Sequence, residues 1–166
     1  LFPMVTMNGE ECHNEWEITF EEIHRNGAIA FAIYNYTRYT SDKSYIREMG
    51  LEILIAISRF WSQRFSFSND KEKYVMLGVT GPNEYENNVN NNWYTNYIAR
   101  WCLIYTKDQI NNLENLFPED FMRISEITNW NKNELILWED IIQKTYLPYD
   151  EKNKIFIQQD GFLDKE

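Results

Sequence analysis

Five stretches of this chain repeat apolar residues every three to four positions, and this spacing constrains the fold more than any other feature. It is the spacing of a helix that buries one face. The predicted helices cover residues 14–38, 43–65, 93–114, 119–128 and 132–146. Residues 74–77 and 154–158 are predicted to be extended. Helices in succession, joined by short connections, indicate an all-α fold built from antiparallel helix pairs.

Length and charge limit the classes of function. With 166 residues the chain can bury one sizeable core. Its net charge of −10 and the lack of a basic stripe argue against a nucleic-acid partner. No run of about 18 apolar residues occurs, so no membrane span is expected. Cys12 and Cys102 fit no pairing or metal spacing, so we expect reduced thiols and a cytoplasmic protein.

The least regular part of the chain runs from residue 77 to residue 96. Gly78, Gly81 and Pro82 interrupt regular structure there, and Glu84 follows on backbone fixed by the proline. Five asparagines come next, at positions 87, 88, 90, 91 and 92. Amides donate and accept hydrogen bonds, and aromatic rings can cover the apolar face of a sugar, so this stretch suits sugar hydroxyls. The alternative is an asparagine-rich turn that caps the next helix.

Residues 80–96, T-G-P-N-E-Y-E-N-N-V-N-N-N-W-Y-T-N, resemble the catalytic-acid segment of the disaccharide phosphorylases of glycoside hydrolase family 65. Residues 4–16, M-V-T-M-N-G-E-E-C-H-N-E-W, are similar to a second segment of that family, and Q-D-G-F at 159–162 also fits. The resemblance covers nearly the whole chain. It implies an (α/α)6 barrel. Because five helices are fewer than such a barrel needs, residues 1–166 are expected to be one contiguous part of the helical catalytic domain.

The resemblance also implies a reaction, the inverting phosphorolysis of an α-glucosyl disaccharide. The segments are nearest to those of family members that convert maltose and phosphate to β-glucose 1-phosphate and glucose. Trehalose, trehalose 6-phosphate, kojibiose and nigerose remain alternative substrates. An alternative of another class is a non-catalytic sugar-binding or helical interaction module. Inorganic phosphate would be the co-substrate, no cofactor is expected, and the whole protein is expected to be a homodimer.

Glu84 is the expected general acid, because in the family the acid directly follows Gly-Pro-Asn. Inverting hydrolysis needs two carboxyl groups, one to protonate the leaving oxygen and one to activate water. A phosphorylase replaces water with phosphate and can work with the acid alone. Asn83 and Tyr85 flank Glu84 and are expected to contact the substrate. The alternative is that Glu84 is a solvated loop residue, and Glu86 is the other nearby carboxylate.

A second set of candidates comes earlier, where Glu11, His13 and Trp16 could contact the acceptor sugar. The alternative is a helix start with acidic residues that favour the helix dipole. Glu11, His13 and His24 fit no metal-ligand spacing, so no metal is expected. The family's Phe-Trp-Asp segment, its Lys-Gln pair and its phosphate-binding Ser/His cluster have no match here, so the isolated chain is expected to be inactive.

Overall fold

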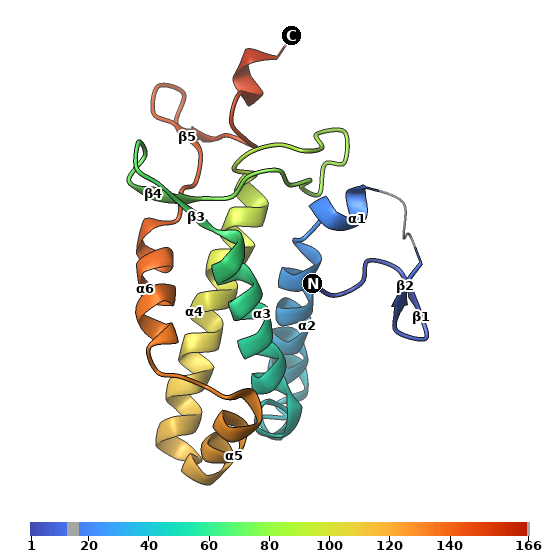
Figure 1. Ribbon diagram of the computed structural model, residues 1–166, viewed down its shortest axis with the longest axis vertical. Coiled ribbons are helices and arrows are strands. Elements are labelled where there is room, and N and C mark those ends of the chain that lie inside the picture. Colours follow the sequence, from blue (N-terminus) through green and yellow to red (C-terminus); the bar gives the residue numbers. More distant parts are fainter. Residues whose placement is uncertain (13–16, 166) are drawn as a thin grey trace.

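The computed structural model describes residues 1–12 and 17–165, and its main body is a group of helices lying side by side (Figure 1). The central helix is α4 (Trp93–Leu116), which contacts the other long helices and α5. Around it lie α2 (Arg25–Thr40), α3 (Leu51–Arg64) and α6 (Glu134–Lys144), and α5 (Pro118–Thr128) lies beyond the far end of α4. The predicted all-α fold is confirmed.

Short elements fill the connections between these helices. Three antiparallel hairpins pair β1 (Thr6–Met7) with β2 (Glu10–Glu11), β3 (Ser66–Ser68) with β4 (Lys73–Val75), and β5 (Tyr149–Asp150) with β6 (Ile155–Phe156). A π-helical turn, Ile46–Gly50, leads into α3, and a 3-10 turn, Phe162–Asp164, lies near the end of the chain. The predicted extended stretches contribute β4 and β6, whereas β1, β2, β3 and β5 were not predicted.

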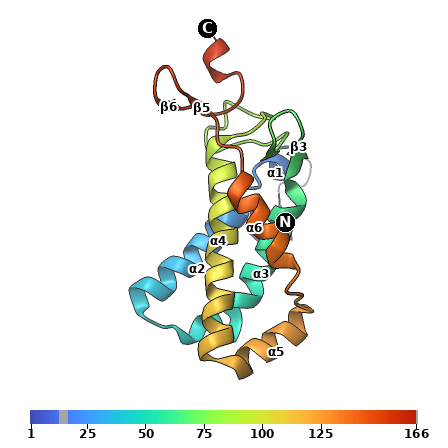
Figure 2. The same ribbon diagram turned by 90° about the vertical axis from the view of Figure 1, so that its left-hand side faces the viewer.

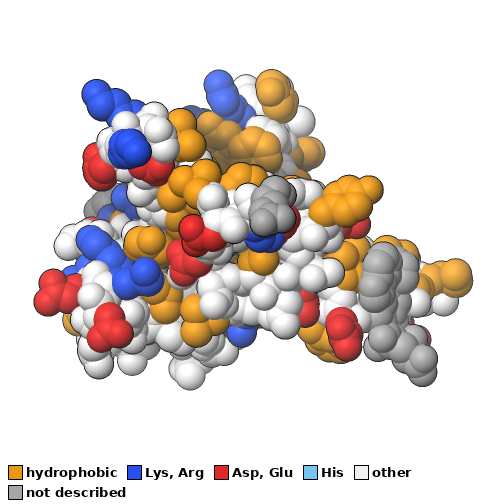
Figure 3. All heavy atoms as spheres, turned by 90° about the horizontal axis from the view of Figure 1, so that it is seen from above, with side chains coloured by type: hydrophobic (Ala, Val, Ile, Leu, Met, Phe, Trp, Pro, Cys, Tyr) orange, Lys and Arg blue, Asp and Glu red, His pale blue; other side chains and the backbone are white. Residues whose placement is uncertain are grey.

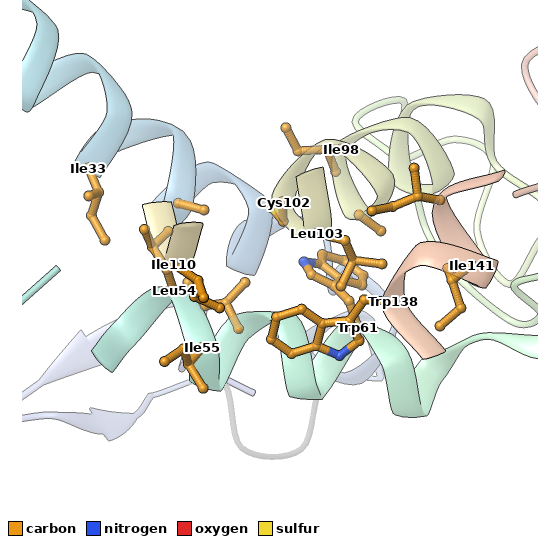
Figure 4. Close-up of a cluster of buried hydrophobic side chains, with 14 of the residues drawn as sticks. Ile33, Leu54, Ile55, Trp61, Ile98, Cys102, Leu103, Ile110, Trp138 and Ile141 are labelled. Atoms are coloured by element: carbon orange, nitrogen blue, oxygen red, sulfur yellow. The ribbon is translucent and has the colours of Figure 1, made fainter. Parts of the chain in front are cut away.

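The hydrophobic core lies between α3, α4 and α6. Cys102 and Leu103 of α4 face Trp61 of α3 and Trp138 of α6, and all four are at most 1% exposed (Figure 4). Burying one large apolar side chain stabilises a fold by roughly 1.5–3 kcal/mol, so this cluster holds the helices together. Gly27 of α2 allows α2 and α4 to pack closely, because a Cβ there would lie 2.4 Å from Cγ1 of Ile98.

The single helix predicted at 14–38 is wrong. In the described part of this range the chain forms α1 (Ile18–Glu21), leaves helical geometry at Glu22 with φ −76° and ψ 55°, and re-enters a helix at Arg25. The break has a long-range cause: the carbonyl of Glu21 accepts a hydrogen bond from the backbone N–H of Thr80 at 3.1 Å. The break places Glu22 and His24 at the end of the helices, beside the irregular stretch.

This end of the helices gathers α1, the irregular stretch and the β5–β6 hairpin (Figures 1 and 2). Seen from above, it presents hydrophobic side chains among acidic and basic ones (Figure 3). Large apolar side chains are also exposed elsewhere, including Met122 of α5 and Ile136 of α6. Within the described residues, no helix combines the length and apolar character that crossing a membrane would require.

Candidate functional site

The loop that carries Glu84 is closed at its base by a pair of backbone hydrogen bonds. Val79 donates to the carbonyl of Val89 at 2.9 Å, and Val89 donates back at 2.8 Å. Gly81 leaves no room for a side chain, because a Cβ there would lie 2.3 Å from Nδ2 of Asn92. The loop therefore has a fixed base, and Glu84 lies near its tip.

The asparagines that follow act mainly on the protein itself. The side chain of Asn91 accepts a hydrogen bond from the Met76 N–H at 3.0 Å and donates to Asp160 at 2.7 Å. Asn92 caps α4 by accepting from the Thr95 N–H at 3.0 Å. Both asparagines are buried. For these two, the turn-and-cap interpretation holds and the interpretation as free sugar-binding amides is wrong.

Glu84 itself is exposed, and its negative charge is close enough to Glu22 to act on the pKa of that residue. Glu22 is buried, with 7% of its surface exposed. Burial raises the pKa of Glu22 most, the negative charge of Glu84 raises it further, and Arg25 opposes them. The loop thus brings the charge of Glu84 near the buried Glu22 of the helix break.

Glu21 and His24 fix the loop on the same side. One carboxylate oxygen of Glu21 accepts hydrogen bonds from the Thr80 hydroxyl at 2.7 Å and from the Asn88 N–H at 2.9 Å. Nδ1 of His24 lies 3.2 Å from the carbonyl oxygen of Thr80, and its ring meets Tyr94 edge-on. Burial lowers the pKa of His24, although the contact with Thr80 opposes this shift. These contacts tie the loop to the helix break.

On the other side, the loop meets the end of the chain. Glu86 accepts a hydrogen bond from Nε2 of Gln159 at 2.6 Å and forms an ion pair with Lys165. Asn83 donates to Oε1 of Gln158 at 3.4 Å. A cavity of about 400 Å³ opens beside Asn83, and its apolar lining includes Trp93 and the aromatic rings of residues 156 and 162. The two carboxylates of the loop therefore differ, since Glu86 is engaged by a cation and Glu84 is exposed.

The structure places the remaining predicted residues as follows. Tyr85 is 98% exposed at the loop tip beside Asn83 and Glu84. Glu11 lies on β2, where its carboxylate accepts hydrogen bonds from the backbone of residues 4 and 5, and its charge acts on Arg25. His13 and Trp16 lie outside the described residues. No structural observation tests the substrate-binding roles, which stay predictions.

Glu22 and His24 are the residues that the sequence did not single out. Both residues lie inside the range 14–38 that the sequence predicts to be one helix. The available signal was two adjacent acids followed closely by a histidine, but their roles depend on a helix break that has no Gly or Pro to mark it. Across residues 1–12 and 17–165, no group of three or more His, Cys, Asp or Glu side chains could hold a metal ion.

Comparison with known proteins connects this geometry to a family. The model of the glycosyl hydrolase family 65 central catalytic domain matches residues 1–166. A maltose phosphorylase of Bacillus subtilis is 56% identical over 168 residues, which cover 100% of this chain and 21% of that protein. A kojibiose phosphorylase of Thermoanaerobacter brockii is 33% identical over 145 residues, covering 87% of this chain and 19% of that protein.

A solved structure shares the fold. It is assigned as a kojibiose phosphorylase from the human microbiome, superposes with a TM-score of 0.86 at 32% identity, and covers 98% of this chain and 21% of its own. The expected architecture, part of an (α/α)6 barrel, is confirmed by this similarity and by the family match. The chain thus spans about a fifth of the length of the relatives it matches.

Proposed function

Because the chain belongs to glycosyl hydrolase family 65, we propose that the whole enzyme phosphorolyses maltose with inversion and that this chain supplies its general acid, Glu84. The reaction consumes maltose and inorganic phosphate and yields β-glucose 1-phosphate and glucose. No cofactor takes part. Like the resemblance to the family, the 56% identity to a maltose phosphorylase supports this substrate over the alternatives.

The observation that carries the assignment of the acid is the contrast between Glu84 and Glu86. Among the described residues Glu84 forms no ion pair, and its side chain is exposed. Glu86 is paired with Lys165 and accepts from Gln159. A general acid must come within hydrogen-bond distance of the oxygen that it protonates. The contacts with Lys165 and Gln159 occupy the Glu86 carboxylate, whereas the exposed Glu84 carboxyl group is left able to contact a substrate.

In the proposed reaction Glu84 donates its proton to the glycosidic oxygen as the bond from that oxygen to C1 of the donor glucose breaks. An oxygen of phosphate attacks C1 from the opposite face, so the anomeric configuration inverts. Phosphate already carries the nucleophilic oxygen, which removes the need for a base that activates water. The fixed base of the loop supports this role, because a general acid must be held at hydrogen-bond distance from the oxygen that it protonates.

Substrate contacts are proposed for five further residues. Asn83 and Tyr85 flank the acid on the loop, and Glu11, His13 and Trp16 are assigned to the acceptor side. The aromatic cavity beside Asn83 is compatible with a sugar ring, since aromatic faces cover the apolar face of a pyranose. We further propose that the whole enzyme is a cytoplasmic homodimer, which sedimentation and cell fractionation would test.

The substrate is tested by phosphate-dependent release of glucose 1-phosphate from the whole enzyme. The panel contains maltose, trehalose, trehalose 6-phosphate, kojibiose and nigerose, and nuclear magnetic resonance identifies the anomer formed. We expect the highest kcat/KM with maltose and the β-anomer as first product. A higher kcat/KM with another disaccharide would replace the substrate, and sugar binding without turnover would favour the non-catalytic module.

A further inference from the structure

Glu84 is carried on a hydrogen-bonded turn of four residues. The N–H of Glu86 donates to the carbonyl of Asn83 at 3.0 Å, which makes Glu84 the second residue of a β-turn over 83–86. Glu84 and Tyr85, at the tip of this turn, are both exposed. Exposed side chains add little packing that could fix the tip, so the place of the Glu84 carboxyl group depends on what holds the two ends of the turn.

Two adjacent glutamines near the end of the chain hold the two ends of this turn. Asn83 donates to Oε1 of Gln158 at 3.4 Å, and Nε2 of Gln159 donates to Oε2 of Glu86 at 2.6 Å. Gln159 is fully buried, whereas the hydrogen bond of Asn83 is long and exposed. A hydrogen bond to a carboxylate is also stronger than one between neutral groups. The bond between Gln159 and Glu86 is therefore the firmer of the two.

The backbone on both sides of Gln159 is itself fixed. The carbonyl of Gln158 accepts a hydrogen bond at 2.8 Å from the N–H of Trp93, the first residue of α4. The N–H of Asp160 donates to the carbonyl of Asn90 at 3.1 Å. Gln159 thus connects the turn to the start of α4, the central helix of the fold.

Lys165 also contacts Glu86, but it is a weaker anchor. Its side chain is 49% exposed and lies near the end of the chain. Ion pairs open to solvent contribute little, because water and salt screen them and a long side chain loses freedom on pairing. The buried amide of Gln159 is therefore the contact that fixes the position of Glu86.

We propose that Gln159 is a positioning residue for the general acid: by holding Glu86, it fixes the turn from which Glu84 reaches the glycosidic oxygen. The inference rests on the proposed function, because it assumes that Glu84 is the acid. A general acid must lie within hydrogen-bond distance of the oxygen that it protonates. A misplacement of about 1 Å, caused by a change away from the reacting atoms, can lower the rate about 10²-fold. Gln159 touches no reacting atom in this scheme and acts only through Glu86.

Gln159→Met in the whole enzyme tests this role, because methionine keeps the length of the side chain and removes the hydrogen-bond donor. We expect kcat for maltose to fall by about 10- to 100-fold, with a smaller change in KM. Phosphorolysis of α-glucosyl fluoride should stay near the wild-type rate, because fluoride leaves without needing a proton. A purely structural role would instead lower the activity on both donors alike.

Variants of Glu86 show whether Gln159 acts through this residue. Glu86→Leu removes the acceptor and should reproduce the pattern of Gln159→Met. Glu86→Gln keeps a carbonyl oxygen that can accept from Nε2 of Gln159, so it should lose little activity. The double variant of Gln159→Met with Glu86→Leu should lose no more than the larger single loss, because both changes break the same contact. Losses that multiply would show that Gln159 does not act through Glu86.

Gln143→Met is the matched control. Gln143 forms the same kind of bond, from its Nε2 to Oε1 of Glu139 at 3.1 Å, on an exposed part of α6. We expect wild-type rates with both donors when this bond is removed.

Gln159→Asn provides the test if Gln159→Met does not fold. The shorter asparagine keeps the amide but draws it away from Glu86, so the same loss on maltose alone is expected. Wild-type kcat on maltose in a folded Gln159 variant, or equal losses on the two donors, would overturn the inference. The proposed function fails separately: in that case Glu84→Gln itself would retain activity on maltose.

Discussion

Replacing Gly81 with Ala tests whether the loop that carries Glu84 is as tightly packed as the structure indicates. The φ of Gly81 is not in the left-handed region, so alanine meets no backbone strain there. The penalty is steric: the new Cβ would lie 2.3 Å from Nδ2, 2.6 Å from Cγ and 2.7 Å from Oδ1 of Asn92. The Asn92 side chain must move, and it is the cap of α4.

The expected cost has two parts. Overpacking of a filled site costs about 1–3 kcal/mol. Loss of a helix N-cap costs about 1 kcal/mol. Movement of the Asn92 cap relieves part of the clash, so the cost of overpacking and the cost of losing the cap are not fully additive. We therefore expect Gly81→Ala to destabilise the loop end by about 2–3 kcal/mol. Asn92→Ala alone should cost about 1 kcal/mol, the value of the cap.

The assay is urea unfolding of the whole enzyme, followed by tryptophan fluorescence, for wild type, both single variants and the double variant. In the Asn92→Ala background the clashing atoms are gone. Gly81→Ala should then add less than about 0.5 kcal/mol, the level at which uncoupled substitutions are additive. A double variant that carries the full sum of the single penalties would refute the reasoning, because the two positions would then not be in contact.

Three further outcomes are expected. Gly27→Ala brings a Cβ to 2.4 Å from Ile98 and should lower the melting temperature of the whole enzyme. Alanine is the better helix former by about 1 kcal/mol, so an unchanged or raised melting temperature would contradict the close packing of Gly27 against Ile98. Arg59, at 2.7 Å, holds the pKa of Glu134 below its ordinary value, so this pair stabilises the fold above about pH 4.5 and the gain is lost as the pH falls through the lowered pKa. Arg59→Met should therefore cost more stability at pH 7 than at pH 3 in urea titrations, and an equal cost would contradict it. Burial raises the pKa of Cys102 to about 12, so mass spectrometry should find this thiol unalkylated at pH 8 until the protein is unfolded.

The long helices could be predicted because their signals are local. The periodic apolar residues of 93–114 and the proline at position 118 mark α4 and the start of α5 within a residue or two. Strand β3 could not be predicted in this way, because its sequence, Ser-Phe-Ser, has a single apolar residue between two polar ones. Its pairing partner, β4, lies several residues later in the chain. Its structure depends on that partner.

The site was also predictable only in part, because some of its residues are marked by local sequence and others depend on long-range contacts. Glu84 follows a turn of Gly and Pro and belongs to a segment typical of a family, so it could be identified from its neighbours in sequence. Glu22, whose pKa the charge of Glu84 raises, lies 62 positions earlier, beside a helix break where Thr80 donates a hydrogen bond to the Glu21 carbonyl. Asn91 and Asn92 show the opposite case: their amides suit a sugar in isolation, but here they bind backbone and side chains of the protein.

The central claim is that Glu84 donates the proton, and the most direct measurement compares two donors. Glu84→Gln in the whole enzyme is assayed by phosphorolysis of maltose and of α-glucosyl fluoride, with Glu86→Gln as the control. Loss of a general acid costs about 10² to 10⁴ in rate. This corresponds to roughly 2.7–5.5 kcal/mol at about 1.36 kcal/mol per tenfold.

We expect Glu84→Gln to lose this factor in kcat with maltose and to keep most of its activity with the fluoride. Glu86→Gln should lose far less activity with maltose. The loss falls on turnover more than on KM, because proton transfer occurs in the transition state. Equal losses on both donors would mean that Glu84 positions the sugar, and an active Glu84→Gln beside an inactive Glu86→Gln would mean that the other carboxylate is the acid.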